Sequence, residues 1–170
     1  MNKKSFTLIE LIIVMALFSV LVVSALWVFV VGLRVWGTNR DRNEIRSESS
    51  LAMERITREL SQASSITNAD EDAITFMADL DDDGSNETVT FSTDSNRLIR
   101  TEAATETSLA FNVEDFALAY RDADNDLMNL PADVASQAKR DLIRVIIISL
   151  AMNKGEESFT LSSSVYARNQ

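Results

Sequence analysis

The stretch that decides the fold covers residues 3–17 and reads KKSFTLIELIIVMAL. It opens an apolar run that stays uncharged from Leu11 to Leu33, over 23 residues. As a helix rising ~1.5 Å per residue, this run would extend about 35 Å, enough to cross a hydrocarbon core of about 30 Å. Basic residues beside an apolar segment tend to stay on the cytoplasmic side, so Lys3 and Lys4 predict that most of the chain lies outside the cytoplasm.

A single acid, Glu10, stands at the start of this apolar run. An ionised carboxylate in a membrane segment costs free energy unless a partner neutralises it, and the segment offers no cation of its own after Lys4. The sequence therefore predicts that the partner of Glu10 comes from elsewhere.

Residues 3–11 resemble the processing signal of type IV pilin-like proteins. In that family a prepilin peptidase cuts before the phenylalanine and methylates the new amine, so the cut here would fall between Ser5 and Phe6. The residue before the cut is commonly Gly in the family, and Ser5 is also small. The resemblance implies that Glu10 pairs with the Phe6 ammonium of a neighbouring subunit inside a helical filament.

Two simpler interpretations compete with the pilin-like one. A secretory signal peptide could be cut after the small residues Val23-Ser24-Ala25, but it would have a shorter apolar region without an acid at its start. A plain signal anchor explains the length and the lysines but leaves Glu10 without a role.

Composition argues against catalysis. The chain of 170 residues contains neither cysteine nor histidine. Disulfides, thiol chemistry and cysteine-based zinc sites are therefore excluded, and the commonest general base and metal ligand is absent. We expect a protein that is not an enzyme and that has one domain beyond the anchor.

Charge is concentrated in the middle of the chain. The net charge is −10, and residues 71–130 alone carry −12. Such a surface repels the phosphates of nucleic acids and favours cations or basic partner surfaces, so no direct nucleic acid binding is expected.

The apolar helix is predicted to continue as an amphipathic helix to about Ile66. Its apolar positions recur at spacings of three, four or seven residues, at Ile45, Ala52, Ile56, Leu60 and Ala63. A short helix is expected over residues 132–137, with Pro131 in its first turn. Period-two patterns and turn residues predict strands over residues 73–77, 87–91, 97–100, 115–121, 142–150 and 159–165. The run 142–150 is expected to be a central strand buried on both faces.

These elements predict an α+β fold, with one long N-terminal helix packed on an antiparallel sheet. The expected segments are a leader peptide (1–5), a transmembrane or filament-core helix (6–35), its amphipathic continuation (36–66) and a β-sheet head (67–170). This arrangement resembles the pilin-like family over the whole chain. Within that family, residues 54–63 and 165–169 resemble minor pilins of the PilW class and J-type minor pseudopilins of type II secretion.

An acidic loop is the candidate metal site. Residues 79–84 read DLDDDG and reproduce the first six positions of an EF-hand-type calcium loop, with Asp79, Asp81 and Asp83 as possible ligands. The acid expected at the end of such a loop is absent, because that position is Thr90, and Glu87 could replace it only if the chain wraps differently. The alternative is an acidic turn between two strands, and we favour it over calcium binding.

The sequence thus predicts a structural minor pilin or pseudopilin. By resemblance, it would be processed by prepilin peptidase, sit in the inner membrane with its head outside the cytoplasm, and join other pilins or pseudopilins through its N-terminal helix. It would help prime, or lie at the tip of, a type IV pilus or a type II secretion pseudopilus. The alternative is a signal-anchored extracytoplasmic binding module, with or without calcium dependence, that does not polymerise.

Overall fold

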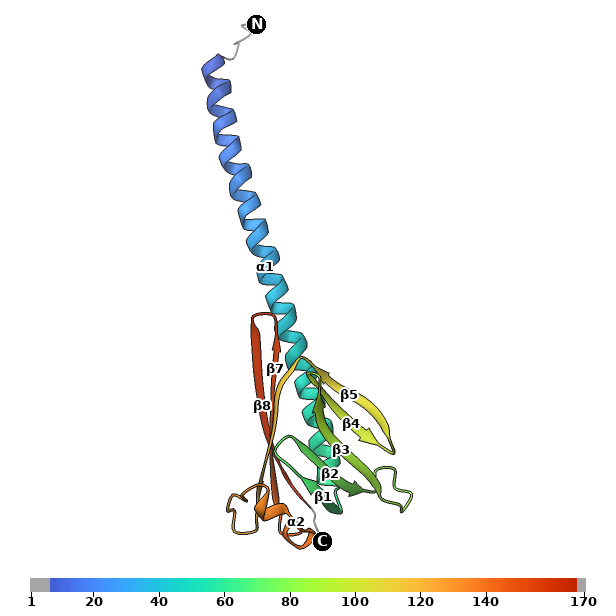
Figure 1. Ribbon diagram of the computed structural model, residues 1–170. Coiled ribbons are helices and arrows are strands. Elements are labelled where there is room, and N and C mark those ends of the chain that lie inside the picture. Colours follow the sequence, from blue (N-terminus) through green and yellow to red (C-terminus); the bar gives the residue numbers. More distant parts are fainter. Residues whose placement is uncertain (1–6, 168–170) are drawn as a thin grey trace. The chain divides into compact units, whose positions relative to one another are not determined.

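The computed structural model describes residues 7–167, and the chain divides into two compact units between Arg40 and Asp41. One helix, α1 (Leu8–Ser61), passes from the first unit into the second (Figure 1). In the first unit the described residues from Leu8 onward are all helical. The second unit, which we call the head, combines the C-terminal part of α1 with two antiparallel sheets.

The head part of α1 is amphipathic, as predicted. The apolar positions Ile45, Ala52, Ile56 and Leu60 are all buried. The helix ends at Ser61, however, and not at the expected Ile66. The reason is that the Ser64 N–H donates to the carbonyl of Met77 at 2.8 Å and starts sheet pairing.

The first sheet, sheet A, has five strands in sequence order, all antiparallel. Its strands are β1 (Ser65–Ala69), β2 (Ala73–Ala78), β3 (Glu87–Asp94), β4 (Arg97–Glu102) and β5 (Thr105–Phe111). The prediction missed β1 and β5. Both are edge strands, and neither shows a clear alternation of polar and apolar residues.

The second sheet, sheet B, has three strands: β6 (Val113–Arg121), β7 (Val145–Lys154) and β8 (Glu157–Tyr166). The predicted central strand is β7, which lies between the other two. The expectation that both of its faces are buried is wrong. Alternate residues from Ile146 to Met152 are buried, whereas those between them are only half-buried, so sheet B carries the core on one face.

The segment around Pro131 also differs from its prediction. In place of one helix over residues 132–137, the structure has a 3-10 turn, η1 (Ala132–Val134), and a separate turn of helix, α2 (Gln137–Arg140). Ser136 separates them because its backbone is extended, with φ −126° and ψ 157°.

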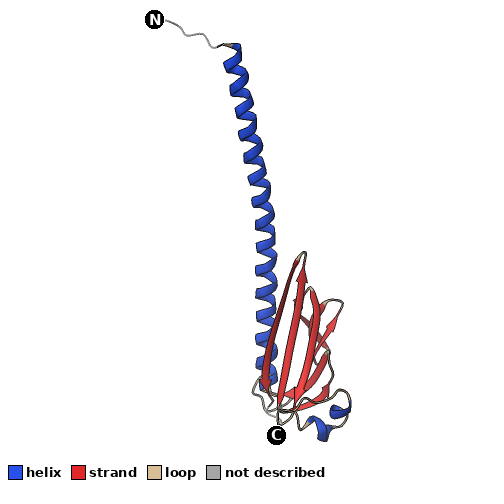
Figure 2. Cartoon of the chain, turned by 90° about the vertical axis from the view of Figure 1, so that its left-hand side faces the viewer, coloured by secondary structure: helices blue, strands red, loops and turns tan. Residues whose placement is uncertain are grey.

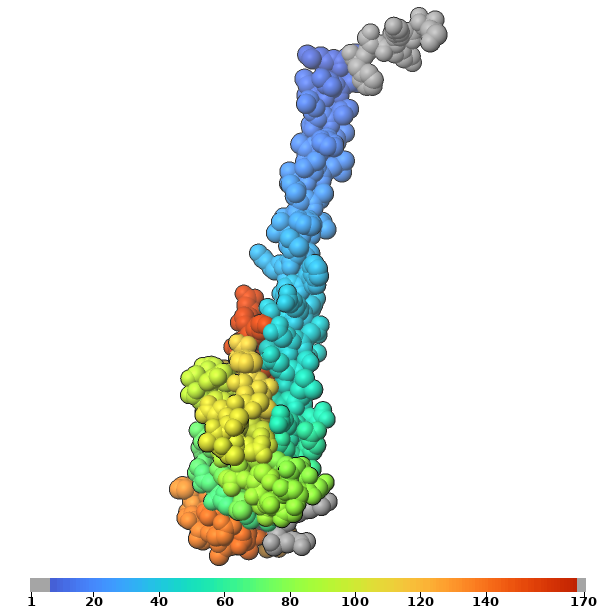
Figure 3. All heavy atoms as spheres, turned by 90° about the vertical axis from the view of Figure 1, so that its right-hand side faces the viewer, coloured from blue at the N-terminus to red at the C-terminus, as the bar shows by residue number. Residues whose placement is uncertain are grey.

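One hydrophobic core joins the head part of α1 to both sheets. The helix reaches sheet A through the Glu59–Arg100 ion pair, and the Arg46 guanidinium lies over the Phe159 ring of sheet B, 5.4 Å from its centre. Figure 2 shows the strands of the head as one group beside the helix. In Figure 3, α1 in cyan lies next to β5 in yellow, where the Phe111 N–H donates to Glu48 Oε2 at 3.4 Å. The architecture is therefore α+β, with a long N-terminal apolar helix packed on antiparallel sheets.

Candidate functional site

The N-terminal end of α1 carries Glu10 in a reciprocal capping arrangement. Glu10 Oε2 accepts hydrogen bonds from the Thr7 backbone N–H at 3.0 Å and from Thr7 Oγ1 at 3.1 Å. In return, the Glu10 N–H donates to Thr7 Oγ1 at 3.4 Å. This is a capping box, in which a Thr at the N-cap and a Glu three residues later each satisfy a free backbone N–H of the helix start.

The capping box was readable from the sequence, because Thr7-Leu8-Ile9-Glu10 has the T-x-x-E pattern. It gives Glu10 hydrogen-bond donors within its own chain, in addition to any partner from elsewhere. The charge of Glu10 is nevertheless not neutralised by Thr7. Pairing with Phe6 stays a prediction, since Ser5 and Phe6 lie outside the described residues.

The surface of α1 beyond Glu10 is apolar and exposed. Large apolar side chains from Leu11 to Trp36 are accessible, with Trp36 at 73%. By length and composition, α1 qualifies as a helix able to cross a membrane, and none of its most apolar window is buried. Such a surface requires lipid or other helices around it.

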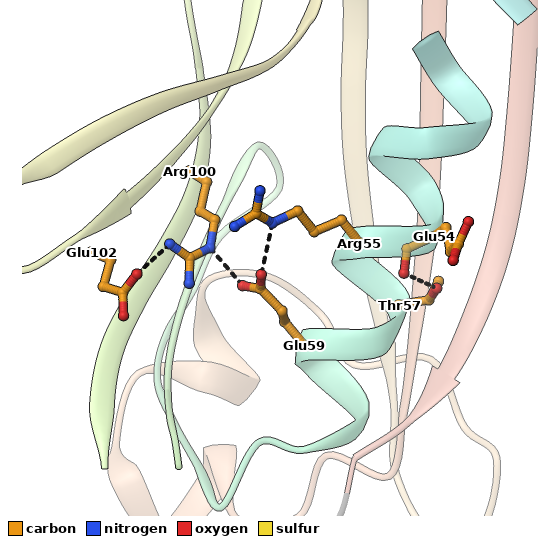
Figure 4. Close-up of polar contacts among 6 residues, drawn as sticks. All are labelled: Glu54, Arg55, Thr57, Glu59, Arg100 and Glu102. Atoms are coloured by element: carbon orange, nitrogen blue, oxygen red, sulfur yellow. Dashed lines mark hydrogen bonds and ion pairs between the residues drawn. The ribbon is translucent and has the colours of Figure 1, made fainter. Parts of the chain in front are cut away.

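A buried ionic network joins the last turns of α1 to β4 (Figure 4). Glu59 Oε2 accepts from Arg100 Nε at 2.7 Å, and Glu59 Oε1 accepts from Arg55 Nε at 2.9 Å. Arg100 Nη1 also donates to Glu102 Oε2. Glu59 and Arg100 are each only 5% exposed, so little of this pair meets solvent, while Arg55 and Glu102 lie nearer the surface.

Burial alone would lower the pKa of Arg100, because it disfavours the charged guanidinium. Hydrogen bonds to Glu59 and Glu102 outweigh that effect and raise the pKa above its ordinary value. The network therefore keeps a positive charge inside the head and fixes the position of α1 against sheet A.

The acidic loop between β2 and β3 brings together Asp79, Asp81 and Glu87. Carboxylate oxygens of these three residues lie within 4.8 Å of one another. Asp83 is not in this group, and its Oδ1 accepts from the Ser85 N–H at 2.7 Å. Glu87 thus joins Asp79 and Asp81 in place of Asp83, and calcium binding by this loop stays a prediction.

The same loop is also a hydrogen-bonded turn. Asp79 Oδ2 accepts from the Gly84 N–H at 3.0 Å, and Gly84 has φ +87°, a conformation that favours glycine. Glu87 Oε2 accepts from the Leu80 N–H at 2.9 Å. Both interpretations of the loop, a calcium site and an acidic turn, are compatible with these contacts.

One cavity connects the acidic loop with the ionic network. Its volume is about 330 Å³, and it lies between the end of α1, β4 and the loop. Its lining includes Arg100 and Glu59 of the network together with Asp81 and Glu87 of the loop. Its lining carries both positive and negative side chains. The cavity therefore suits water or a hydrated cation better than an apolar ligand.

Comparison with known protein families gives a match at the N-terminus. Residues 1–26 match the family described as the prokaryotic N-terminal methylation motif. No curated protein matches the chain. The match covers the capping box and the first part of α1 but no residue of the head.

The motif and the fold together define a pilin-like protein. Proteins of this class are typically structural and not enzymes. The motif implies processing by prepilin peptidase and assembly with other pilins. With the apolar helix, it indicates association with the inner membrane or a pilus.

Proposed function

We propose that this chain is a minor pilin or pseudopilin. Prepilin peptidase would remove residues 1–5 and methylate Phe6, and the helix from Phe6 to residue 35 would then occupy the membrane or the filament core. The observation that supports this is the methylation motif at the start of a long exposed apolar helix that carries a folded head.

The proposed role is to prime filament assembly or to form the filament tip. Residues 54–63 and 165–169 resemble minor pilins of the PilW class and J-type pseudopilins, and this resemblance supports a minor subunit over a major one. The ionic network suits such a role, because it makes residues 54–59 a rigid support for the head.

Intact-mass measurement tests the processing step. The full chain, extracted from its native membranes, should begin at methylated Phe6. Retention of residues 1–5, or a cut near Ala25, would contradict the proposal.

Variants of Glu10 separate its charge from its capping role. Glu10→Gln keeps the capping box, because Gln also serves at this position, but it removes the negative charge. Glu10→Val removes both. If the carboxylate pairs with the Phe6 ammonium of a neighbour, both variants should be inserted and cleaved normally but should fail to crosslink to partner pilins, because breaking one side of a buried pair costs about 3–5 kcal/mol.

Thr7→Ala is the matched control, since it weakens the cap and keeps the charge. We expect it to assemble. Crosslinking of Glu10→Gln at the wild-type level would refute the charge pair, and loss in Glu10→Val alone would assign the effect to the cap.

A binding module that does not polymerise is the second candidate. The closeness of the Asp79, Asp81 and Glu87 carboxylates favours it, and Asp81 and Glu87 also line the cavity. In that case residues 1–5 would be retained in the membrane-extracted protein.

A further inference from the structure

The free edge of β8 is unlike the other strand edges of the head. A strand at a sheet edge exposes unpaired backbone N–H and C=O groups, and proteins usually protect such edges with charges, prolines, bulges or covering segments. In sheet B the strand order is β6, β7, β8, so β8 has a neighbour on one side only (Figure 1).

The edges of sheet A are protected. β1 has a bulge near Ile66, and the Ile66 carbonyl accepts from Gln137 Nε2 at 3.0 Å. β5 has a register shift against Leu98–Ile99, carries Glu106, and is fixed to α1 through Phe111.

The other edge of sheet B, β6, is protected as well. It has a bulge between Val113 and Asp115, and its Leu118 N–H donates to the Glu71 carbonyl at 2.6 Å. Its far end is covered where the Met128 N–H donates to the Tyr120 carbonyl at 2.9 Å.

From Ser158 onward, β8 lacks all of these features. Its register against β7 is regular over all ten residues, and residues 158–166 contain neither charge nor proline. Among the described residues, no backbone hydrogen bond reaches residues 157–166 from outside sheet B.

The pairing pattern identifies the unpaired groups. The Ala167 N–H donates to the Arg144 carbonyl at 3.0 Å, which continues the register one step beyond Val145 and Tyr166. Hydrogen-bonded pairs alternate along an antiparallel ladder. The residues whose backbone groups point away from β7 are therefore Ser158, Thr160, Ser162, Ser164 and Tyr166.

We propose that the β8 edge docks an extended, uncharged segment of a different protein, which adds to sheet B as a fourth strand. Main-chain hydrogen bonds give such a complex its affinity. The edge lies in the head, and only the choice of a different protein over a second copy rests on the proposed membrane anchor.

A second copy of the chain fits this edge poorly. At the start of β8, Glu157 pairs with Arg42 and Phe159 lies under Arg46, so β8 runs in the same direction as α1 within the head. Antiparallel pairing of two β8 strands would therefore set the two α1 helices in opposite directions. Two copies anchored in one membrane need parallel helices, and parallel strand pairs are slightly less stable per residue.

Amide hydrogen exchange of the full chain tests the proposal. The amides of Ser158, Thr160, Ser162 and Ser164 should exchange rapidly in purified protein in detergent. In native membranes, where the partner is present, they should exchange at least about tenfold more slowly. Equal rates in the two preparations would overturn the proposal.

A matched pair of variants tests the backbone contact. Ser162→Pro removes an outward N–H and no hydrogen bond to β7, a position where an edge strand accepts proline. Ser162→Ala keeps the N–H. We expect both to melt like wild type and only Ser162→Pro to lose the slow exchange in membranes. Retained protection in a folded Ser162→Pro variant would overturn the proposal.

Two further results are decisive. If Ser162→Pro unfolds, the wild-type comparison between detergent and membranes decides alone. If the purified chain dimerises in sedimentation experiments and its β8 amides become protected with increasing concentration, a second copy occupies the edge and the assignment to a different protein is wrong.

Discussion

Replacing Glu59 by Gln should destabilise the head strongly. The Glu59 carboxylate accepts from Arg100 at 2.7 Å and from Arg55 at 2.9 Å. A Gln side chain has nearly the same shape but only one oxygen, so its NH2 group would face one of the two guanidinium groups. One arginine then loses its acceptor and meets a donor in its place.

The magnitude follows from burial. The side chains of Glu59 and Arg100 are 7% and 6% exposed, so water can compensate for only a small part of the lost charge. Removing one partner of a buried pair costs about 3–5 kcal/mol, and the remaining bond to Glu102 places the expected loss near 3 kcal/mol. Arg55 is 39% exposed, so Arg55→Gln should cost about 0–1 kcal/mol.

Urea unfolding of the full chain in detergent micelles measures this loss, with circular dichroism as the probe of the strands. Tryptophan fluorescence is unsuitable, because Trp27 and Trp36 both lie outside the head. The double variant Glu59→Met/Arg100→Met should recover most of the stability, because it removes both buried charges together and leaves neither of them without its partner. A loss below about 1 kcal/mol for Glu59→Gln would show that the pair behaves like a surface salt bridge and would refute the argument.

Three other predictions concern the head. Calcium bound by Asp79, Asp81 and Glu87 at 100 times its dissociation constant should stabilise the fold by about 2.7 kcal/mol, so the melting temperature should be higher in millimolar calcium than in chelator; equal values leave only the turn. Burial, and then Asp70 and Asp72, raise the pKa of Tyr120. The neutral phenol is therefore favoured in the folded state, and the free energy of unfolding should fall by about 1.4 kcal/mol per pH unit above about pH 10, a slope absent in Tyr120→Phe. Ile56→Ala, at a fully buried position, should cost about 2–5 kcal/mol in the same urea experiment, whereas Leu51→Ala on the exposed face should cost little.

The parts of the fold with strong local patterns were predictable. The apolar run after Glu10 and the spacing from Ile45 to Leu60 indicate one long helix, and the alternation in residues 73–77 and 87–91 indicates strands. β5 was missed because its first residues, Thr105 to Thr107, are polar and exposed, and its pairing with β4 supplies the order that its composition does not.

The candidate site was predictable only in part. Asp79 and Asp81 follow from the spacing of acids in one loop, but the approach of Glu87 depends on how β3 returns beside β2. The Glu59–Arg100 pair joins residues 41 positions apart in the sequence. A charged residue on a helix is usually solvated, so its burial could be recognised only once sheet A was in place.

The last two strands complete the head. The core needs residues Ile146 to Met152 of β7, and β7 is in turn paired along its full length with β8. Both strands follow α1 and sheet A in the chain. Until they are made, the core that buries Ile56 is incomplete and the segments before β7 stay open. The head therefore closes only after the whole of α1 has been made.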